Sequence, residues 1–265
     1  MKNHHMVIGE DVSVVSFSSQ ERGECISYDH CHDRYEITYL LSARGRYIVE
    51  GHEHKVSNGS LLLICPMSYH KVELEPCEVE GITVEFSKSI LSDRVSGLLD
   101  GLCDGSDIHG RFYSAAHVCE ALISVFDRFA LAQDLKEGRD SYLQALLTEV
   151  IVLLSATEGE LMVVSEDELG ARVARYLNTN FRKNVSLDRL ARRFFVSKYH
   201  LCRAFKEYSG ISVHAYVNHK RIIFAKSLIE SGMTASGAAE KVGFGDYSAF
   251  YRAYVKILGK SPNAS

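Results

Sequence analysis

The sequence predicts an α+β fold: a small N-terminal β-barrel with helices after it, then an all-α domain in which a long helix joins two helix-turn-helix units. Three observations predict this fold. Short strand-like segments separated by turn residues fill residues 20–87. Apolar residues recur near every 3.6 positions across 88–156 and 169–259. The second of these helical regions also repeats itself, and 265 residues suffice for two domains with a core each.

Composition indicates a globular chain without disulfides or membrane spans. Hydrophobic residues make up 46% and charged residues 24%, which is ordinary for a soluble protein. The seven cysteines are an odd number and form no CxxC pair, so free thiols and a cytoplasmic location are expected. The start of the chain has no signal-peptide pattern. The most apolar stretch, ALLTEVIVLLS, contains a glutamate and is too short to cross a bilayer, so no membrane partner is expected.

The strand region shows turn signals at regular spacing. EITYLL and RYIVEG flank SARG, which predicts a hairpin in which Gly45 supplies a positive φ. VSNGS indicates a second turn, LLLIC a buried strand that stops at Pro66, and GITVEFS the last strand of the series. Several short strands at this spacing are typical of a small sandwich or barrel.

The middle of the chain changes from strand patterns to helix patterns. SKSILSDRVSGLLDGL and the ranges 115–134 and 139–156 have helical periodicity. The apolar faces of the last two helices are expected either to pack on the barrel or to form the two-fold seam of a homodimer. Residues 157–168 are acidic and weakly periodic, which predicts a linker between domains at 1–156 and 169–265.

Charge is divided unevenly along the chain. Residues 167–265 hold 17 Lys+Arg and 7 Asp+Glu, a net of +10, while residues 1–166 carry a net of −14. A basic module of this size is a candidate for polyanion binding, and nucleic acid is the commonest such partner. A solvated basic helical domain without such a partner is the alternative that composition leaves open.

The C-terminal region contains an internal repeat. Arg203-Ala204-Phe205 and Arg252-Ala253-Tyr254 are each followed, at the same distance, by Gly-x-Ser. Upstream, with one residue inserted in the turn, the corresponding apolar positions are Leu187, Leu190, Ala191, Phe194 and Val196 in the first copy and Ala235, Ala238, Ala239, Val242 and Phe244 in the second. Each copy predicts a short helix, a tight turn and a second helix. The expected helix caps are Ser186, Ser197, Thr234 and Asp246.

In such a unit the second helix buries one face and offers the other to the major groove of DNA. An arginine can bind the edge of guanine with two hydrogen bonds, a tyrosine or cysteine can contact a thymine methyl group, and a lysine suits phosphate. The candidate DNA-binding residues are Lys198, Tyr199, Cys202, Arg203, Ser248, Tyr251 and Arg252. A joining helix of about 18 residues, about 27 Å long, can hold the two units about one DNA turn apart.

Over residues 180–262 the sequence resembles the AraC/XylS family of bacterial transcription regulators. The resemblance lies in SLDRLARRFFVSKYHLCRAFKEYSGIS, KRIIFAKSLI and AAEKVGFGDYSAFYRAYVKILGKSP. It implies sequence-specific binding of double-stranded DNA by both second helices and control of transcription, for which we expect activation, with RNA polymerase as a further candidate partner. Ala235 and Ala238 replace larger aliphatic residues usual in the family, and Gly237 costs its helix about 1 kcal/mol.

The N-terminal part resembles the cupin-like sensor domain of the same family, in HCHDRYEITYLLSARGRYIVEG, NGSLLLICPMSYH and GITVEFS. The candidate effector-binding residues are His30, His32, Glu36 and His70. They line a pocket for a small polar effector such as a sugar, or are structural, or bind Zn, Fe or Mn as imidazole and carboxylate groups can. We prefer the effector pocket, and because the spacing departs from that of metal-binding cupins we assign no metal and no cofactor.

The sequence thus predicts a regulator and not an enzyme, in which 1–156 bind an effector and dimerise and 169–265 bind DNA. Neither a GxSxG motif, nor paired catalytic carboxylates, nor a phosphate-binding loop is present in the sequence. Two alternatives remain open. One is a metal-dependent cupin enzyme with an accessory DNA-binding domain, and the other is a DNA-binding protein that needs no effector.

Overall fold

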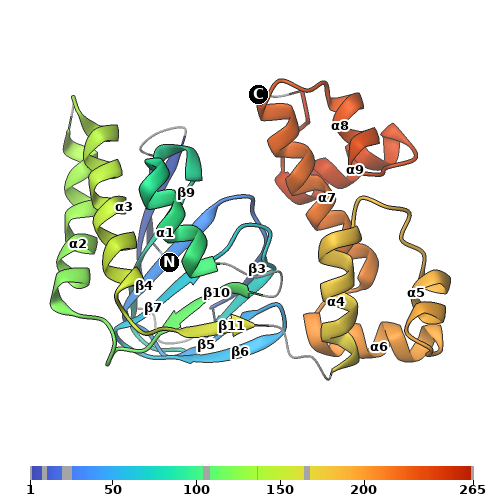
Figure 1. The fold of residues 1–265 in the computed structure, drawn as a ribbon, viewed down its shortest axis with the longest axis horizontal. Helices are drawn as coiled ribbons and strands as arrows, with labels where there is room; N and C mark the ends of the chain where they lie inside the picture. The colour runs from blue at the N-terminus through green and yellow to red at the C-terminus, as the bar shows by residue number, and fades with distance from the viewer. Residues whose placement is uncertain are drawn as a thin grey trace. The chain divides into compact units, whose positions relative to one another are not determined.

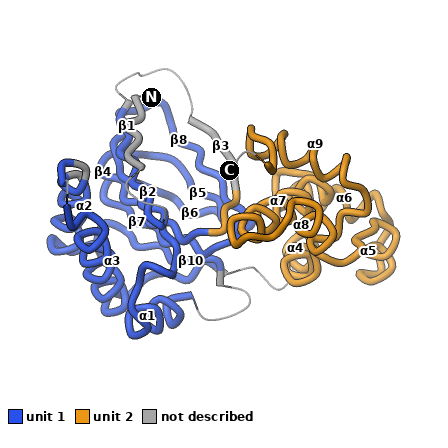
Figure 2. The backbone as a smooth tube through the Cα atoms, turned by 90° about the horizontal axis from the view of Figure 1, so that it is seen from above, with its two compact units in different colours: residues 1–30, 34–163 blue, residues 31–33, 164–265 orange. Residues whose placement is uncertain are grey.

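The structure is a computed structural model that describes residues 2–7, 11–19, 26–103, 108–135, 137–163 and 168–263. The chain forms two compact units, residues 1–30 with 34–163 and residues 31–33 with 164–265 (Figure 2). The first unit contains all the described strands, and the described helices after residue 168 form the second. This arrangement confirms the predicted α+β class. Among the described residues, no helix is long and apolar enough to span a membrane.

Two antiparallel sheets pack on each other in the N-terminal unit (Figure 1). The larger sheet has the strand order β1-β2-β9-β4-β7-β10-β11, and the smaller has the order β3-β8-β5-β6. The strands are β1 Lys2–Val7, β2 Val12–Ser19, β3 Ile26–His30, β4 Tyr35–Ser42, β5 Gly45–Val49, β6 His52–Val56, β7 Ser60–Ile64, β8 His70–Leu74, β9 Val79–Phe86, β10 Ile108–Tyr113 and β11 Glu160–Val163. Leu40 and Leu62 of the larger sheet and Tyr47 and Val72 of the smaller belong to one buried cluster, which forms the barrel interior.

The predicted hairpin around SARG is wrong. β4 pairs with β7 and β9, whereas β5 pairs with β6 and β8, so the two strands lie in different sheets. The chain changes sheets at Gly45, whose φ is 150°. A β-carbon there would lie 2.2 Å from the carbonyl oxygen of Glu73, so the corner requires glycine. Alternation along a strand assigns its faces but does not identify its neighbours, which is why the sequence did not reveal the crossing.

The strand β7 explains the continuous apolar run LLLIC. All of its residues, Ser60–Ile64, are buried. Leu61 and Leu63 pack in the cluster shared with the helices, and Leu62 and Ile64 pack between the sheets. Because both faces of this strand are covered, it lacks the polar residues that alternate along a half-exposed strand.

Helices cover the outer face of the larger sheet (Figure 1). They are α1 Asp93–Cys103, α2 Glu120–Leu131 and α3 Arg139–Ser155. Phe126 of α2 and Leu147 of α3 are buried in one cluster with Ile37 and Val84 of the sheet. The apolar faces predicted within 115–134 and 139–156 therefore pack on the barrel, and the homodimer stays a prediction.

The predicted linker, residues 157–168, contains a strand. β11 pairs with β10 at the edge of the larger sheet. Met162 anchors β11, because its side chain is buried in the cluster between the sheets. The N-terminal unit consequently extends to Val163. A strand of four residues within an acidic segment is too short for its periodicity to be recognised. The predicted linker therefore began too early in the sequence.

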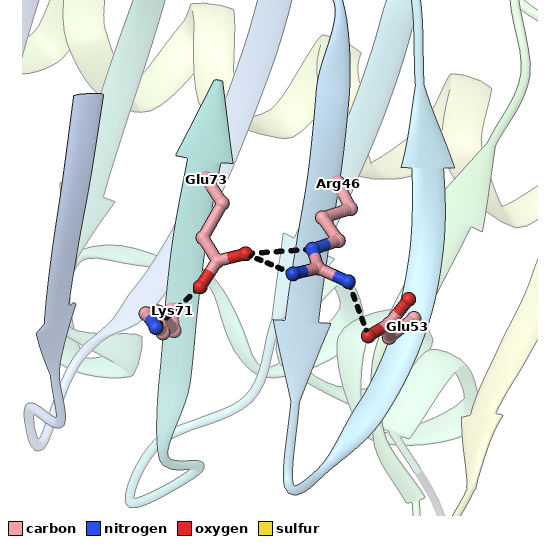
Figure 3. A network of polar contacts seen from close by, with 4 residues as sticks. All are labelled: Arg46, Glu53, Lys71 and Glu73. Carbon is pink, nitrogen blue, oxygen red and sulfur yellow. Dashed lines mark hydrogen bonds and ion pairs between the residues drawn. The ribbon is translucent and has the colours of Figure 1, made fainter. Parts of the chain in front are cut away.

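The outer face of the smaller sheet is charged (Figure 3). Arg46 of β5 donates to Glu73 of β8 at 2.6 Å and to Glu53 of β6 at 2.8 Å, and Lys71 also pairs with Glu73. Lys71 and Arg46 hold the pKa of the Glu73 carboxyl below its ordinary value, against the opposing effect of desolvation. Exposed pairs of this kind contribute little stability. They show instead that Arg46 faces solvent, which turns its neighbour Tyr47 into the barrel.

The C-terminal unit has the predicted order of two helix-turn-helix units joined by a long helix. Its helices are α4 Leu169–Asn180, α5 Leu187–Arg193, α6 Lys198–Ser209, α7 Val213–Glu230, α8 Ala235–Lys241 and α9 Tyr247–Leu258. The side chains of Ser186, Ser197, Thr234 and Asp246 accept hydrogen bonds from first-turn N–H groups of α5, α6, α8 and α9. These bonds confirm the predicted caps.

Candidate DNA-binding faces and effector site

The first candidate DNA-binding face lies on α6. Leu201, Phe205 and Tyr208 are buried on its inner side. On the other side Lys198, Tyr199 and Arg203 are exposed and Cys202 is half-buried. The Tyr199 side chain is 77% exposed, so packing within the unit does not account for an aromatic residue at this position.

Two exposed ion pairs hold the cations of this face. Lys198 Nζ lies 2.9 Å from Asp188 Oδ1, and Arg203 Nε donates to Glu207 Oε1 at 3.0 Å. Lys198 holds the pKa of the Asp188 carboxyl below its ordinary value. Because exposed pairs are weak, a phosphate or a guanine edge can replace either carboxylate at little cost.

The second candidate DNA-binding face lies on α9. Phe250 and Tyr254 are buried, and Ser248, Tyr251 and Arg252 are exposed, as the repeat predicts. Both copies therefore expose the predicted residues to solvent, except that Cys202 is half-buried. The contacts of these residues with DNA stay predictions.

A polar junction within the C-terminal unit fixes one helix-turn-helix unit on the other. Arg221 of α7 donates from Nε to the Phe181 carbonyl and from Nη2 to the Lys183 carbonyl, each at 2.7 Å. Its guanidinium carbon also lies 5.6 Å from the ring centre of Phe244, in the turn of the second unit. Burial lowers the pKa of this guanidinium, which nevertheless stays charged because arginine titrates far above neutral pH. The segment before α5 is thereby held against the turn between α8 and α9.

The candidate effector site lies in the barrel around a buried carboxylate. Glu36 of β4 is 2% exposed. Its Oε1 accepts hydrogen bonds from Thr38 Oγ1 at 2.7 Å and from the Tyr47 hydroxyl at 2.9 Å. Thr38 Oγ1 also lies 2.8 Å from Thr83 Oγ1 of β9. A polar group of this kind is retained in an interior when hydrogen bonds compensate its desolvation.

The His70 ring completes this site, and its position requires a positive charge between the ring and the Glu36 carboxylate. His70 Nδ1 lies 3.0 Å from the Ser68 carbonyl oxygen, which can only accept, so Nδ1 carries a hydrogen. Its Nε2 lies 3.3 Å from Glu36 Oε2. A neutral ring would then direct a lone pair at a carboxylate oxygen. A proton or another cation between the two atoms removes this repulsion.

Within the N-terminal unit the structure brings two of the four predicted effector residues together, Glu36 and His70. An imidazole and a carboxylate are both ligands that transition metals accept. His32 lies in the segment 31–33, which belongs to the second unit. His30 lies opposite His70 in the β3–β8 register, but its side chain is outside the described residues.

Sequence reasoning missed Thr38, Tyr47 and Thr83 at this site. Thr38 could have been found, because it lies two residues after Glu36 on the same strand and therefore shares its face. Tyr47 and Thr83 could not, since they come from other strands and their positions depend on the pairing of the sheets.

Acidification is expected to destabilise the N-terminal unit through His54. This side chain is 7% exposed, and its Nε2 has no partner among the described residues. Burial lowers its pKa, an effect that Glu160 opposes and His52 reinforces. Below about pH 6.5 the unfolded chain therefore binds a proton that the folded unit resists, so stability is full above that pH and falls as the pH drops toward the folded pKa. Urea denaturation across this range should show a shallower pH dependence for His54→Gln than for the wild-type chain.

Comparison with known proteins covers both units. Residues 22–163 match the AraC-like ligand binding domain, and residues 190–264 match a helix-turn-helix domain. The chain is 26% identical over 226 residues to the uncharacterized HTH-type transcriptional regulator YbfI of Bacillus subtilis, covering 83% of this chain and 80% of that protein. It is 23% identical to the HTH-type transcriptional activator RhaS of Escherichia fergusonii, over 88% of this chain and 85% of that one.

Among solved structures, ToxT from Vibrio cholerae O395 aligns over 96% of each chain, with a TM-score of 0.44 and 12% identity. The ligand-binding match alone spans more than half of the present chain. The exposed faces of α6 and α9 and the polar site inside the barrel lie in the two matched regions. The chain therefore belongs to the AraC family of transcriptional regulators, with an N-terminal ligand-binding domain and a C-terminal helix-turn-helix domain that binds DNA.

Proposed function

We propose that this protein is a cytoplasmic transcriptional activator, and not an enzyme, whose binding to a defined operator is controlled by a small polar effector such as a sugar. The buried network of Glu36, Thr38, Tyr47 and His70 carries the effector part of this proposal. It offers donors and acceptors in a largely apolar barrel interior, as the hydroxyl groups of a carbohydrate require. The Glu36 carboxylate would repel an anionic effector, which favours a neutral or cationic one.

The effector acts by binding two conformations of the protein with different affinity. A homodimer would let one operator be read by two copies, and activation requires a contact with RNA polymerase. We include a second copy of the chain and RNA polymerase as partners because of the resemblance to the family. The exposed faces of α6 and α9 support the proposal, since each copy would then have two helices that could enter a DNA groove.

The operator comes first in the test. Selection from a random duplex library with the full chain should enrich a defined sequence, whose affinity is then measured by fluorescence anisotropy. Enrichment of no sequence would refute the operator-specific function and leave a non-specific DNA-binding protein.

The effector is then sought among monosaccharides and other small polar metabolites. We expect one class to change operator affinity by about fivefold or more. Glu36→Gln and Tyr47→Phe should abolish that change and keep the affinity without effector, because neither residue lies in the helix-turn-helix units. A response that survives both substitutions would place the effector elsewhere. Transcription with purified RNA polymerase distinguishes activation from repression.

A metal-binding cupin is the second candidate function, favoured by the proximity of His70 Nε2 and Glu36 Oε2, which lie 3.3 Å apart. A cation bound there would supply the positive charge needed between His70 and Glu36. The Ser68 carbonyl oxygen, which accepts a hydrogen bond from His70 Nδ1, would fix the orientation of the ring. Metal analysis before and after chelation, with thermal melts in added Zn²⁺ or Mn²⁺, tests this candidate. Stoichiometric metal that His70→Gln removes would support it, and enzyme activity that depends on the metal would overturn the regulator-only assignment.

A further inference from the structure

Phe195 has an unusual backbone conformation for a large side chain. It follows α5 in the turn of the first helix-turn-helix unit, with a φ of 55°. The turn is closed by hydrogen bonds from Phe195 N to the Arg192 carbonyl and from Val196 N to the Ala191 carbonyl. Bulky residues rarely adopt this left-handed conformation, because the β-carbon crowds the backbone.

The second copy of the repeat has glycine at the corresponding position. Gly243 has a φ of 90°, and the hydrogen bond from Phe244 N to the Ala239 carbonyl matches the one from Val196 to Ala191. Glycine is the usual residue at this helix-ending position. The same turn therefore occurs twice in one chain, once with the favoured residue and once with a phenylalanine.

Packing within the unit does not compensate for this choice. The Phe195 side chain is 94% exposed, the highest value among the exposed large hydrophobic residues described. It borders an open recess with Ala191, Val196 and Ser197. A strained and exposed aromatic residue is better explained by a contact outside the folded chain than by stability.

The surroundings of Phe195 indicate DNA as that contact. Phe195 lies two residues before Ser197, the N-cap of α6, and the N-terminal end of such a helix contacts base edges. Arg192 and Lys198 are exposed on either side in sequence, and Tyr199 is exposed in the first turn. The exposed cations on either side of the ring can contact the phosphates that border the major groove. The ring itself can contact the thymine methyl group, which is an apolar group within that groove.

We propose that Phe195 is a further specificity-determining residue, whose ring packs on the C5-methyl group of a thymine beside the bases that α6 reads. This inference rests on the proposed DNA-binding function. Under this inference the turn that contains Phe195 contacts a base in addition to the bases contacted by α6. The first copy of the repeat would therefore prefer a thymine at that position, whereas the second copy, with Gly243 in its turn, would not.

The test combines a protein change with a base change. The full chain and its Phe195→Gly and Phe195→Asn variants are titrated with the selected operator by fluorescence anisotropy. Each thymine is then replaced singly by deoxyuridine, which removes only the methyl group. Leu131→Ala is the matched control, because Leu131 is an exposed apolar residue on α2 in the N-terminal unit.

We expect both Phe195 variants to bind the operator about 5- to 20-fold less tightly, the range of one lost base contact. One thymine-to-deoxyuridine change should weaken wild-type binding and leave Phe195→Gly unaffected. The melting temperature of Phe195→Gly should not fall, since glycine relieves the strain, so a loss of binding is not a loss of folding.

Wild-type affinity in both Phe195 variants would overturn the inference and leave the proposed function intact. Unchanged affinity with lost activation by RNA polymerase would also overturn it, and would assign Phe195 to a protein partner. A wild-type chain that enriches no duplex overturns the proposed function itself, and the inference with it.

Discussion

Replacing Arg203 by alanine is expected to lower affinity for the selected operator about 10- to 100-fold, with little change on random DNA. An arginine that binds a guanine edge through two hydrogen bonds supplies about 1–3 kcal/mol of discrimination against other bases. Arg203 is exposed, and its pair with Glu207, at 3.0 Å, is too weak to prevent the exchange. Arg252→Ala should act in the same way at a different base pair. Anisotropy titrations with singly substituted operators locate the two positions.

Two controls separate base recognition from charge. Arg203→Lys keeps the positive charge but cannot form the bidentate hydrogen bonds to guanine. It should therefore lose nearly as much discrimination between bases as Arg203→Ala. Lys198→Ala should instead weaken binding to all duplexes and reduce the slope of log affinity against log salt by about 0.9, the value of one phosphate contact. Equal losses on operator and random DNA for both arginine variants would contradict their assignment to bases.

Replacing Gly243 by alanine is expected to destabilise the C-terminal unit by about 3 kcal/mol, a large effect for one methyl group. The φ of 90° at this residue is already unfavourable for alanine. A β-carbon would in addition lie 2.2 Å from the Arg182 carbonyl oxygen, in the segment that Arg221 holds. Urea denaturation followed by the helical circular dichroism signal measures the loss.

Neighbouring glycines provide matched controls for Gly243. Gly210→Ala introduces the same kind of strain at a φ of 78° where a β-carbon meets nothing within 4 Å, so it isolates the backbone cost. Gly245→Ala has neither a positive φ nor a close neighbour and should be nearly neutral. If Gly243→Ala lowers the free energy of unfolding no more than Gly210→Ala does, the segment around Arg182 can shift to accommodate the β-carbon. The two DNA-binding faces would then not be rigidly coupled.

The C-terminal unit was predictable because its information is local. The caps at Ser186 and Ser197, the helical spacing of Leu201 and Phe205, and the turn glycine all act within a few residues of chain. The exposure of Arg203 and Arg252 follows from that spacing alone. The role of Arg221 did not follow, since its partners at Phe181 and Lys183 lie about 40 residues away in the sequence.

The N-terminal unit was predictable only in its class. Turn residues marked strands, but β11 lies hidden within an acidic segment, and β4 and β5 proved to lie in different sheets. Two candidate effector residues, Glu36 and His70, do meet, although the sequence alone could not say that Tyr47 joins them.

By itself the sequence determined which residues of the C-terminal unit form helices, which faces of those helices are apolar, and that a basic repeat follows an acidic N-terminal part, because these properties depend on side-chain type and short-range spacing. Only the tertiary structure decided which strands are neighbours, that Tyr47 and His70 meet at the Glu36 carboxylate, and that Gly243 packs against Arg182. These contacts join residues that are distant along the chain, and their positions depend on the packing of the sheets and helices as a whole.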